Sequence, residues 1–465
     1  MSSNAKTLKA SKIACWIALA CLVVPMFGSY FFDDMFSTVS HIFKNPQMLQ
    51  LGWDAADFGL YAGAYSLLCV WGGLVICGIL LDIYGVRLVG SIFVGLMVLG
   101  SAVVTFAISN PSFSPKTALA VAYAGCTVFG LGSEIAGVAV TRSIAKWFKG
   151  KNVALAMGLQ LAIARLGTAF AFFLSPILVA EKVQGEVYLL SDTNKPAIVG
   201  LALLFAGAIL WAVFVAMDAR YDKQEGIMKV KGEVKEDDKF RFSDILKVLS
   251  NGRFIMISLL CVFFYCCIIS FKKFGTSILM PRFDLNVNTA KWMITMIPFF
   301  TVVFTPLFGA LVDKIGKATT WMISGAVLVF LSHILIAFAP EGVPFWGYFA
   351  IALLGVGYSL VPSAMWPTVP KIVPEKNLGT AYSLIYWIQN MGMLLVPIFV
   401  GAIFKNQITA DPADMVYHSQ EVVAAVHAEY IFLGLGIVAI TVAVLLSINS
   451  RKHPELKIDC PSKEV

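Results

Sequence analysis

The sequence predicts an all-α membrane protein with twelve transmembrane helices in two six-helix bundles and with both termini in the cytoplasm. Three observations lead to this prediction. Hydrophobic residues make up 58% of the 465 residues and charged residues 14%, a composition too apolar for a chain that must cover itself with polar surface. Twelve apolar runs are long enough to cross a membrane. A short glycine- and aspartate-containing motif occurs once in each half of the chain.

Each apolar run is about 20 residues long, which at ~1.5 Å per helical residue crosses a ~30 Å hydrocarbon layer. The first run extends past Phe32 without a small-residue cleavage site, so we expect it to remain as a helix and not to be removed as a signal peptide. The twelve runs begin near Ile13, Ala55, Val86, Ala118, Ala154, Ile198, Phe254, Trp292, Thr319, Phe345, Gly379 and Ala428.

The distribution of lysine and arginine predicts the orientation. Of the 35 basic residues, 25 fall in the termini and the loops on the same side as the termini, 7 in the opposite loops and 3 within the runs. By the positive-inside rule, both termini are cytoplasmic. The basic stretch from Arg220 to Arg253 is then a cytoplasmic loop beside the lipid bilayer, which accounts for the net charge of +7 without a nucleic-acid partner.

The repeated motif, G-x-L-x-D-x-x-G, follows the second and the eighth run. We interpret its first glycine as a close helix contact, its aspartate as a cap for a neighbouring helix and its second glycine as a tight turn. The first glycines of the two copies are 231 residues apart (309 − 78), which indicates two similar halves. The motif residues are Gly78, Asp82, Gly85 and Arg87 in the first copy and Gly309, Asp313 and Gly316 in the second.

This repeat divides the chain into four predicted parts. We expect an amino-terminal six-helix bundle over residues 1–217 and a cytoplasmic linker over 218–252. The second bundle is predicted over residues 253–450, followed by a cytoplasmic tail over 451–465.

Two opposite charges lie deep in neighbouring runs. Glu134 is 13 residues before Trp147, and Arg165 is 14 residues after Lys151, so each is ~20 Å from the short basic turn between the two runs. A charge at this depth costs at least ~2.5 kcal/mol on insertion scales, and such residues usually face a cavity. The pair therefore indicates a substrate or coupling site, with a structural ion pair as the alternative.

Other polar and aromatic side chains are candidates for the same site. Adding the repeat offset of 231 to Glu134 gives position 365, which places a tryptophan beside the matching depth of the second half. Amides in the eleventh run are candidates for the same wall, with interhelical packing as the alternative. The further substrate-binding candidates are Tyr30, Tyr265, Trp366, Tyr386, Gln389 and Asn390.

A second group of charges lies toward the outer ends of the first and seventh runs, which correspond in the repeat. We predict that Asp34, together with Asp33, faces Lys272 and Lys273 in an outer charged gate. The alternatives are a solvated helix end for the two aspartates and snorkelling of the lysines to the outer surface. His333 is predicted to make an ordinary hydrogen bond between helices.

The sequence predicts neither an enzyme nor a cofactor. Eight of the nine cysteines fall in apolar runs, and no metal-ligand spacing accompanies them. There is also no nucleophile–base pair or phosphate-binding loop. We therefore expect no metal, no cofactor and no catalytic residue.

Both motif copies resemble the signature loop of the major facilitator superfamily, which implies two bundles that rock about a central site. The stretch 353–392, with WFKGK, GLQLAIARLG and GSYFFDD, is similar to the lysosomal dipeptide transporter branch of that superfamily. This closer resemblance implies that Glu134 holds the amino end of a dipeptide and Arg165 its carboxylate. The chain departs from the branch at Tyr386, where an amide is expected, and in lacking an acidic dileucine signal near the amino end.

From this resemblance we expect a uniporter or proton-coupled carrier of dipeptides or similar small zwitterions. An organic-anion or monocarboxylate carrier is the alternative, and a membrane receptor or scaffold without transport is the alternative of another class. We expect a monomer in a bacterial cytoplasmic membrane, with a lysosomal membrane as the alternative. The branch also implies a possible accessory membrane protein.

Overall fold

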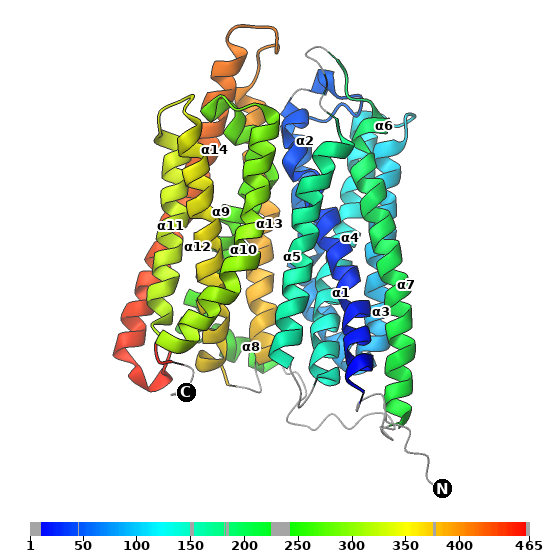
Figure 1. Cartoon of the computed structure of the whole chain (residues 1–465), viewed down its shortest axis with the longest axis vertical. Helices are drawn as coiled ribbons and strands as arrows, with labels where there is room; N and C mark the ends of the chain where they lie inside the picture. Colours follow the sequence, from blue (N-terminus) through cyan, green and yellow to red (C-terminus); the bar gives the residue numbers. More distant parts are fainter. Residues whose placement is uncertain are drawn as a thin grey trace.

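The computed structural model describes residues 11–44, 46–148, 153–180, 182, 186–224, 242–374 and 378–461. In this part of the chain, twelve helices are long and apolar enough to span a membrane, which confirms the predicted fold class and number of spans. Their axes are roughly aligned with one another, and α1 begins at the end of the molecule where α14 finishes (Figure 1). We call this end the terminal side and the other end the opposite side.

The first bundle contains the long helices up to α7 and several short turns. Its elements are α1 (Lys12–Asp34), η1 (Ser37–Lys44), η2 (Pro46–Met48), α2 (Ala55–Ala64), η3 (Cys69–Gly73), α3 (Leu74–Ser109), α4 (Pro115–Trp147), α5 (Val153–Leu178), α6 (Leu190–Thr193) and α7 (Lys195–Gln224). The second bundle is preceded by the short helix α8, which we include among its elements. Its elements are α8 (Phe242–Leu249), α9 (Gly252–Phe283), α10 (Val287–Ile315), α11 (Ala318–Phe338), α12 (Pro344–Ile372), α13 (Leu378–Gln407), α14 (Tyr417–Lys452) and η6 (Pro454–Leu456).

Side-chain caps begin several of the spanning helices. Ser11 accepts a hydrogen bond from the amide of Ala14 at the start of α1, and Ser114 does the same for Thr117 at the start of α4. A glycine makes the bend between the second and third spans: Gly85 has φ +80° within α3. Glycine tolerates this backbone conformation without steric cost, so the second and third spans follow each other with a sharp bend and little intervening loop.

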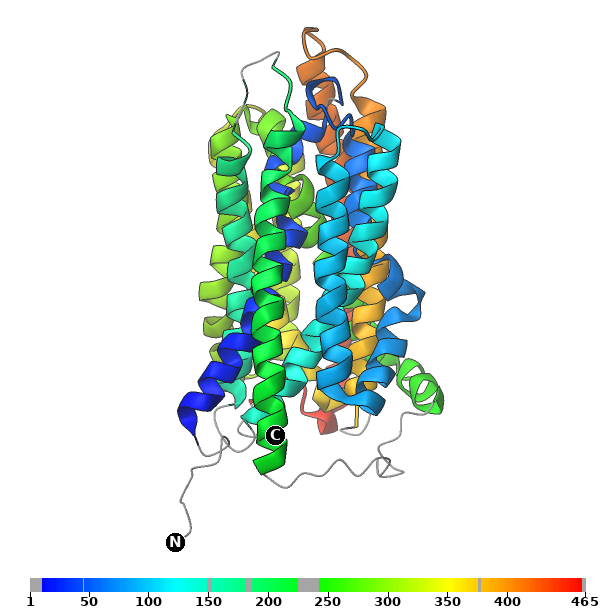
Figure 2. The ribbon, with the colours of Figure 1, turned by 90° about the vertical axis from the view of Figure 1, so that its right-hand side faces the viewer.

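The helices pack mainly within their own half. In the first half, α1 packs on α5 and α7 and α3 packs on α4; in the second, α9 packs on α14 and α11 on α12. The halves meet where α2 contacts α13 and α5 contacts α10. The two bundles stand side by side in Figure 1, and the view turned by 90° in Figure 2 shows the same alignment of the helix axes.

Some predicted boundaries differ from the ends of the helices. Helix α7 continues to Gln224, past the predicted end of the first half, and α14 continues to Lys452. Residues 225–241 of the predicted linker and Lys151 of the predicted basic turn lie outside the described residues. The predicted division of the chain into four parts stays a prediction.

Candidate functional site

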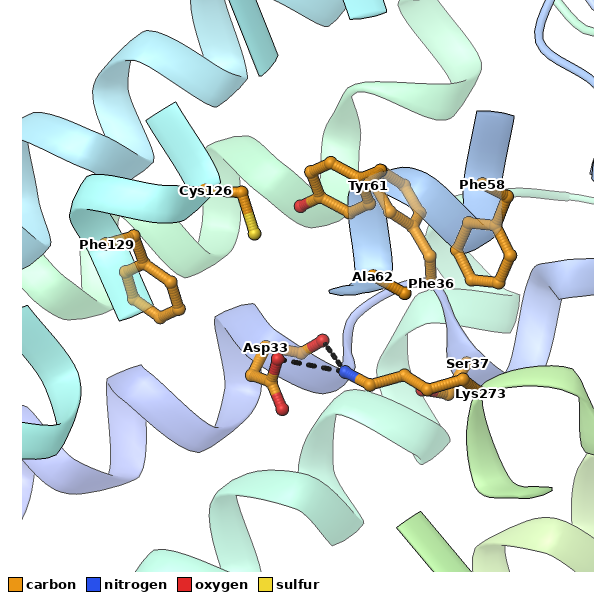
Figure 3. Close-up of a pocket in the computed structure, with 9 residues that line it drawn as sticks. All are labelled: Asp33, Phe36, Ser37, Phe58, Tyr61, Ala62, Cys126, Phe129 and Lys273. Carbon is orange, nitrogen blue, oxygen red and sulfur yellow. Dashed lines mark hydrogen bonds and ion pairs between the residues drawn. The ribbon is translucent and has the colours of Figure 1, made fainter. Parts of the chain in front are cut away.

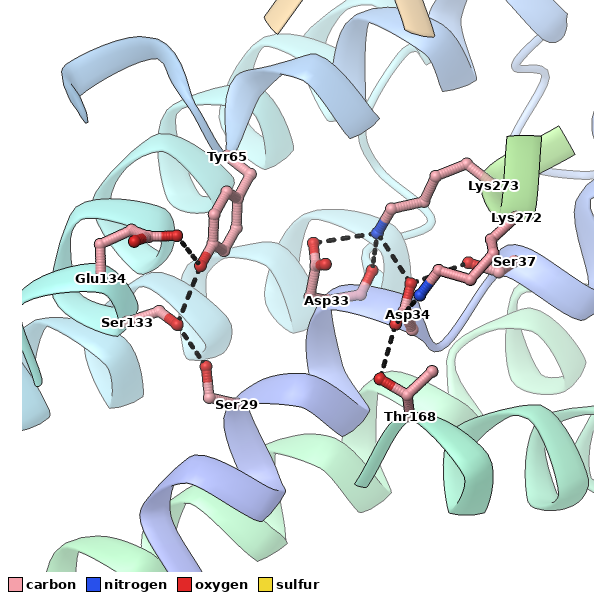
Figure 4. Close-up of polar contacts among 10 residues, drawn as sticks. All are labelled: Ser29, Asp33, Asp34, Ser37, Tyr65, Ser133, Glu134, Thr168, Lys272 and Lys273. Atoms are coloured by element: carbon pink, nitrogen blue, oxygen red, sulfur yellow. Dashed lines mark hydrogen bonds and ion pairs between the residues drawn. The ribbon is translucent and has the colours of Figure 1, made fainter. Parts of the chain in front are cut away.

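Glu134 ends a chain of hydroxyl groups in the first half. The hydroxyl of Tyr65 donates to Oε1 of Glu134 across 3.0 Å and lies 3.0 Å from Oγ of Ser133. Ser133 in turn shares a hydrogen bond with Ser29 of α1, as Figure 4 shows. Because the hydroxyl of Tyr65 has one proton, it donates to Glu134 or to Ser133 at any one time. The half-buried carboxylate of Glu134 is thereby held by a neutral partner.

Arg165 reaches from α5 to the second half of the molecule. Its Nη1 donates to Oγ1 of Thr305 in α10 across 3.0 Å, and its guanidinium carbon lies 5.6 Å from the ring centroid of Tyr358 in α12. Both Glu134 and Arg165 lie in the described part of the chain, and no ion pair within 4.0 Å joins them. The alternative of a structural ion pair between these two residues is therefore wrong for this conformation.

An aromatic wall stands in the second half beside Arg165. The indole nitrogen of Trp366 donates to the hydroxyl of Tyr265 across 3.1 Å, and its ring centroid is 5.3 Å from that of Tyr386. Tyr382 packs on the same indole at 5.9 Å, while Tyr358 contacts Tyr265 edge-on at 6.0 Å. Since Tyr358 also underlies Arg165, the arginine and the aromatic wall form one continuous surface.

The remaining candidates are arranged less directly. Gln389 accepts a hydrogen bond from the thiol of Cys261 at 3.4 Å and contacts the sulfur of Met393 at 3.5 Å, contacts that fit the packing alternative. Asn390 donates to the carbonyl of Tyr386 one turn earlier, and its Oδ1 is buried without a hydrogen-bond partner among the described residues. Helix α1 packs against α5 and α7 of the first bundle. The side chain of Tyr30 on this helix is nevertheless 37% exposed, so it is accessible in this conformation.

The predicted gate charges come together between the two halves. Nζ of Lys272 lies 3.1 Å from Oδ2 of Asp34, and Nζ of Lys273 lies 2.9 Å from Asp33 and 3.4 Å from Asp34. Thr168 of α5 also donates to Asp34 across 2.8 Å. Two acids of α1 thus meet two lysines of α9 (Figure 4), and all four charges are balanced.

A narrow pocket adjoins this cluster. It is lined by Asp33 and Lys273 and by the aromatic rings of Phe36, Phe58, Tyr61 and Phe129 (Figure 3). The rings cover part of the ion pair: the side chain of Lys273 is 7% exposed and that of Asp33 is 24% exposed. Low local polarity of this kind strengthens an ion pair that is fully matched.

Further contacts between the halves lie on the opposite side of the molecule. Ser40 bonds to Thr276 across 2.8 Å, and two ion pairs, both at 2.8 Å, join the halves nearer the surface. These pairs are Lys44 with Glu421 and Lys405 with Asp54. Together with the gate charges they hold the opposite side closed.

The two signature loops lie on the terminal side. In the first, Arg87 lies 2.9 Å from Asp222, while Lys146 lies 2.7 Å from both Asp218 and Asp222. Trp147 donates to Asp218 across 2.8 Å. This network ties α3 and α4 to the end of α7, and Arg87 is the one motif residue in it whose side chain is described. The side chain of Asp82 lies outside the described residues.

One role predicted for the motif is wrong in this conformation. A Cβ added to Gly78 or Gly309 would have no neighbour within 4 Å, so neither glycine makes the close helix contact expected of it. The amide of Thr319, in the first turn of α11, donates to Asp459 across 2.8 Å, and helix capping by the motif aspartate Asp313 stays a prediction. The cap of α11 comes from a residue far along the chain.

A membrane protein built from two six-helix halves, with opposite charges at mid-depth and ion pairs between the halves at one end, has the architecture of a secondary transporter. The model of the Major Facilitator Superfamily matches residues 26–283 and 263–459, and the chain belongs to this family. It is accordingly an integral membrane transporter and not an enzyme, as the sequence predicted.

The comparisons also identify relatives. The chain is 30% identical over 387 residues to the lysosomal dipeptide transporter MFSD1 of Danio rerio, covering 81% of this chain and 78% of the relative. A solved structure of a variant of the nucleoside transporter NupG has a TM-score of 0.64 at 14% identity, covering 92% of this chain and 99% of that chain. A variant of the peptide transporter POT has a TM-score of 0.60 at 15% identity, covering 92% and 94%. These solved structures support the fold.

Proposed function

We propose that this protein carries dipeptides or similar small zwitterions by alternating access, with Glu134 binding the substrate ammonium and Arg165 its carboxylate. One observation carries the proposal. An acid and a base lie at the same predicted depth, they do not pair with each other, and each is hydrogen-bonded to a neutral hydroxyl. Both charges are therefore available to the two charged ends of a zwitterion. The name of the relatives, lysosomal dipeptide transporter, supports the same substrate class.

Substrate binding would exchange neutral partners for charged ones. An ammonium replaces the hydroxyl of Tyr65 at Glu134, and a carboxylate replaces the hydroxyl of Thr305 at Arg165. Each exchange is favourable because hydrogen bonds between charged groups are stronger than those with a neutral partner, and because a guanidinium can bind a carboxylate through two parallel bonds. A dipeptide, which presents both ends, makes both exchanges at once.

The exchange at Arg165 also connects binding to movement. Thr305 belongs to the second half and Arg165 to the first, so a carboxylate that displaces Thr305 releases a bond between the halves. Binding energy is thereby used to free the two bundles to rock, which is the step that alternating access requires.

The aromatic wall would receive the substrate side chains. Trp366, Tyr265 and Tyr386 offer large apolar faces with few hydrogen-bond requirements, which suits a carrier that accepts many side chains. Tyr30, Gln389 and Asn390 complete the proposed lining. Oδ1 of Asn390 is buried and has no hydrogen-bond partner among the described residues, so a peptide N–H that reached it in another conformation would satisfy it.

The gate charges and the signature loops indicate which side of the carrier is open in this conformation. Asp33, Asp34, Lys272 and Lys273 keep the opposite side closed. On the terminal side, Gly78 and Gly309 have empty space where a Cβ would stand, as expected of surfaces that meet only when that side closes. We propose that the terminal side faces the cytoplasm, in line with its excess of basic residues.

Coupling and location complete the proposal. If Glu134 takes up a proton when no substrate is bound, the carrier is a symporter. If it does not, the carrier is a uniporter. Uptake of substrate driven by a pH gradient alone separates the two. The name of the relatives matches the lysosomal membrane, the second of the two expected locations, and the bacterial cytoplasmic membrane is the other. A monomeric carrier and an accessory membrane protein stay predictions.

The test is a thermal-shift and flux experiment on purified protein. Dipeptides should raise the melting temperature and cross liposome membranes, whereas keto acids should not, and Glu134→Gln and Arg165→Ala should each abolish the stabilisation. Glu341→Gln, which changes an exposed glutamate, is the matched control. Stabilisation by keto acids and not by dipeptides would establish the anion carrier, and the absence of flux of either solute would favour a receptor or scaffold.

A further inference from the structure

The chain folds back after α14 and packs under the second half on the terminal side. The segment 453–461, which we call the latch segment, is centred on Asp459. One carboxylate oxygen of Asp459 accepts from the amide of Thr319 across 2.8 Å, and the hydroxyl of Thr319 lies 3.0 Å from both oxygens. The other oxygen accepts from Ser450 across 2.8 Å. Asp459 thus caps α11 and joins it to the end of α14.

A lysine holds the same segment from a third helix. Nζ of Lys371, at the end of α12, donates to the carbonyl oxygens of Lys457, Ile458 and Cys460 across 3.0, 3.3 and 3.3 Å. An ammonium has three protons, so its whole donor capacity is directed at the main chain of the latch segment. The side chain of Ile458 is buried in a cavity that Val312 of α10 and Thr368 of α12 also line.

The signature loop of the second half is shaped to accept this segment. Gly316 has φ +71°, and a Cβ built on it would collide with the main chain at Asp459, Cys460 and Pro461. The main-chain oxygen of Asp459 also accepts from the amide of Lys317 across 2.8 Å. The close approach that the motif glycine permits is therefore to the latch segment.

The first half holds the corresponding corner in a different way. There, Asp218 and Asp222 stand on α7 itself and pair with Arg87 and Lys146 of the neighbouring helices. In the second half the acid stands seven residues beyond the last spanning helix (459 − 452). The first corner is therefore fixed within its helices, whereas the second depends on a segment that can separate from them.

We propose that the latch segment is a conformational device: when docked it fixes the terminal ends of α10, α11, α12 and α14 as one unit, and its release changes how far the terminal side opens. The helices it joins also carry the candidate site. Thr305 is eleven residues before Gly316 in the chain (316 − 305), and Trp366 is five residues before Lys371 (371 − 366). Docking of the latch segment thus sets the spacing between Thr305, which bonds to Arg165, and Trp366 of the aromatic wall. This holds for any substrate.

The protein contains its own reporter for this device. Cys460 lies in the latch segment and is half-buried, and the other eight cysteines are buried. We would label the full-length, detergent-purified protein with a hydrophilic maleimide and follow both the rate and the number of labels by mass spectrometry. Labelling of one cysteine reports release of the segment, and labelling of several reports unfolding, so the two events are separated in one measurement.

Lys371→Met and Asp459→Ala remove the contacts from either side. Each should raise the rate of single labelling about tenfold, the effect of losing a hydrogen bond to a charged group, without the appearance of further labels. Lys452→Met, on the exposed end of α14, is the matched control and should label like the wild type. Equal rates in the wild type and both variants would overturn docking of the segment.

A second measurement tests the consequence for the carrier. In a Cys460→Ser background, a cysteine placed at Gly309 should react with the maleimide at a severalfold different rate after deletion of residues 453–465, because Gly309 lies on the terminal side near the joined helices. The same rate before and after deletion, in protein that still melts cooperatively, would overturn the role in opening. Neither measurement requires a transported substrate.

Discussion

Nη1 of Arg165 lies 3.0 Å from Oγ1 of Thr305, so the half-buried cation of the first half is bonded to a neutral hydroxyl of the second half. The bond crosses the plane along which the two bundles must move. The strength of this bond therefore affects both the affinity for substrate and the balance between conformations. Replacing the hydroxyl oxygen of Thr305 removes the bond.

Thr305→Val keeps the shape of the side chain and removes that oxygen. We expect dipeptides to bind about 10- to 150-fold more tightly, because the substrate carboxylate no longer displaces a hydrogen bond to a charged group, worth about 1.5–3 kcal/mol. A calorimetric titration of the purified variant measures the change. Weaker binding would contradict the exchange and would indicate that Thr305 positions Arg165 for the substrate.

The ring of Tyr358 supports the guanidinium of Arg165 at 5.6 Å. Tyr358→Leu should weaken dipeptide binding about 2- to 30-fold, the range expected from the loss of a cation–π contact worth about 0.5–2 kcal/mol. Tyr358→Phe keeps the ring and is the control, which should bind like the wild type. Equal losses in both variants would show that the hydroxyl matters and the ring face does not.

Asp34 receives bonds from Lys272, Lys273 and Thr168 in a buried position. Removing one partner of a buried ion pair costs about 3–5 kcal/mol, so Asp34→Asn should favour the conformation with its opposite side open. A cysteine placed at Ser40, which is buried between the halves, should then react faster with a membrane-impermeant thiol reagent.

The exposed change Asp411→Asn serves as the control for this prediction and should leave the reaction rate at position 40 unchanged. The double exchange Asp34→Lys with Lys272→Asp should restore slow labelling, because it rebuilds the pair with reversed charges. Fast labelling of the double variant would contradict the assignment of Asp34 and Lys272 as direct partners.

His333 and Glu429 form a fully buried pair in the second half, with 2.6 Å between Nδ1 and Oε2 and no exposed surface on either side chain. The hydrogen bond predicted for His333 is therefore present. Glu429→Ala leaves the imidazole without this partner and should destabilise the protein by about 1–3 kcal/mol, measured by thermal unfolding in detergent. Replacing both residues by leucine should recover most of this loss, and a double variant less stable than Glu429→Ala would contradict that account.

Much of the architecture follows from properties that are local in the sequence. Run length and apolar composition predict the twelve spans, and the spacing between the two motif copies predicts the repeat. The depth of Glu134 and Arg165 follows from counting residues along a helix, because the rise per residue is constant. Likewise, Asp34 and Lys272 stand near the outer ends of corresponding helices, and the structure brings them to 3.1 Å.

The tertiary structure alone decided which side chains meet across helices. Glu134 and Arg165 share a depth, yet Glu134 bonds to Tyr65 and Arg165 to Thr305. The direction of a side chain around its helix axis and the choice of neighbouring helix are set by packing, and a hydroxyl in an apolar run has no distinguishing pattern. The amide of Thr319 at the start of α11 is capped by Asp459, 140 residues later in the chain. The sequence by itself therefore determined the spans, the repeat and the depth of the charges, and only the fold decided their partners, because those partners come from separate helices brought together by packing.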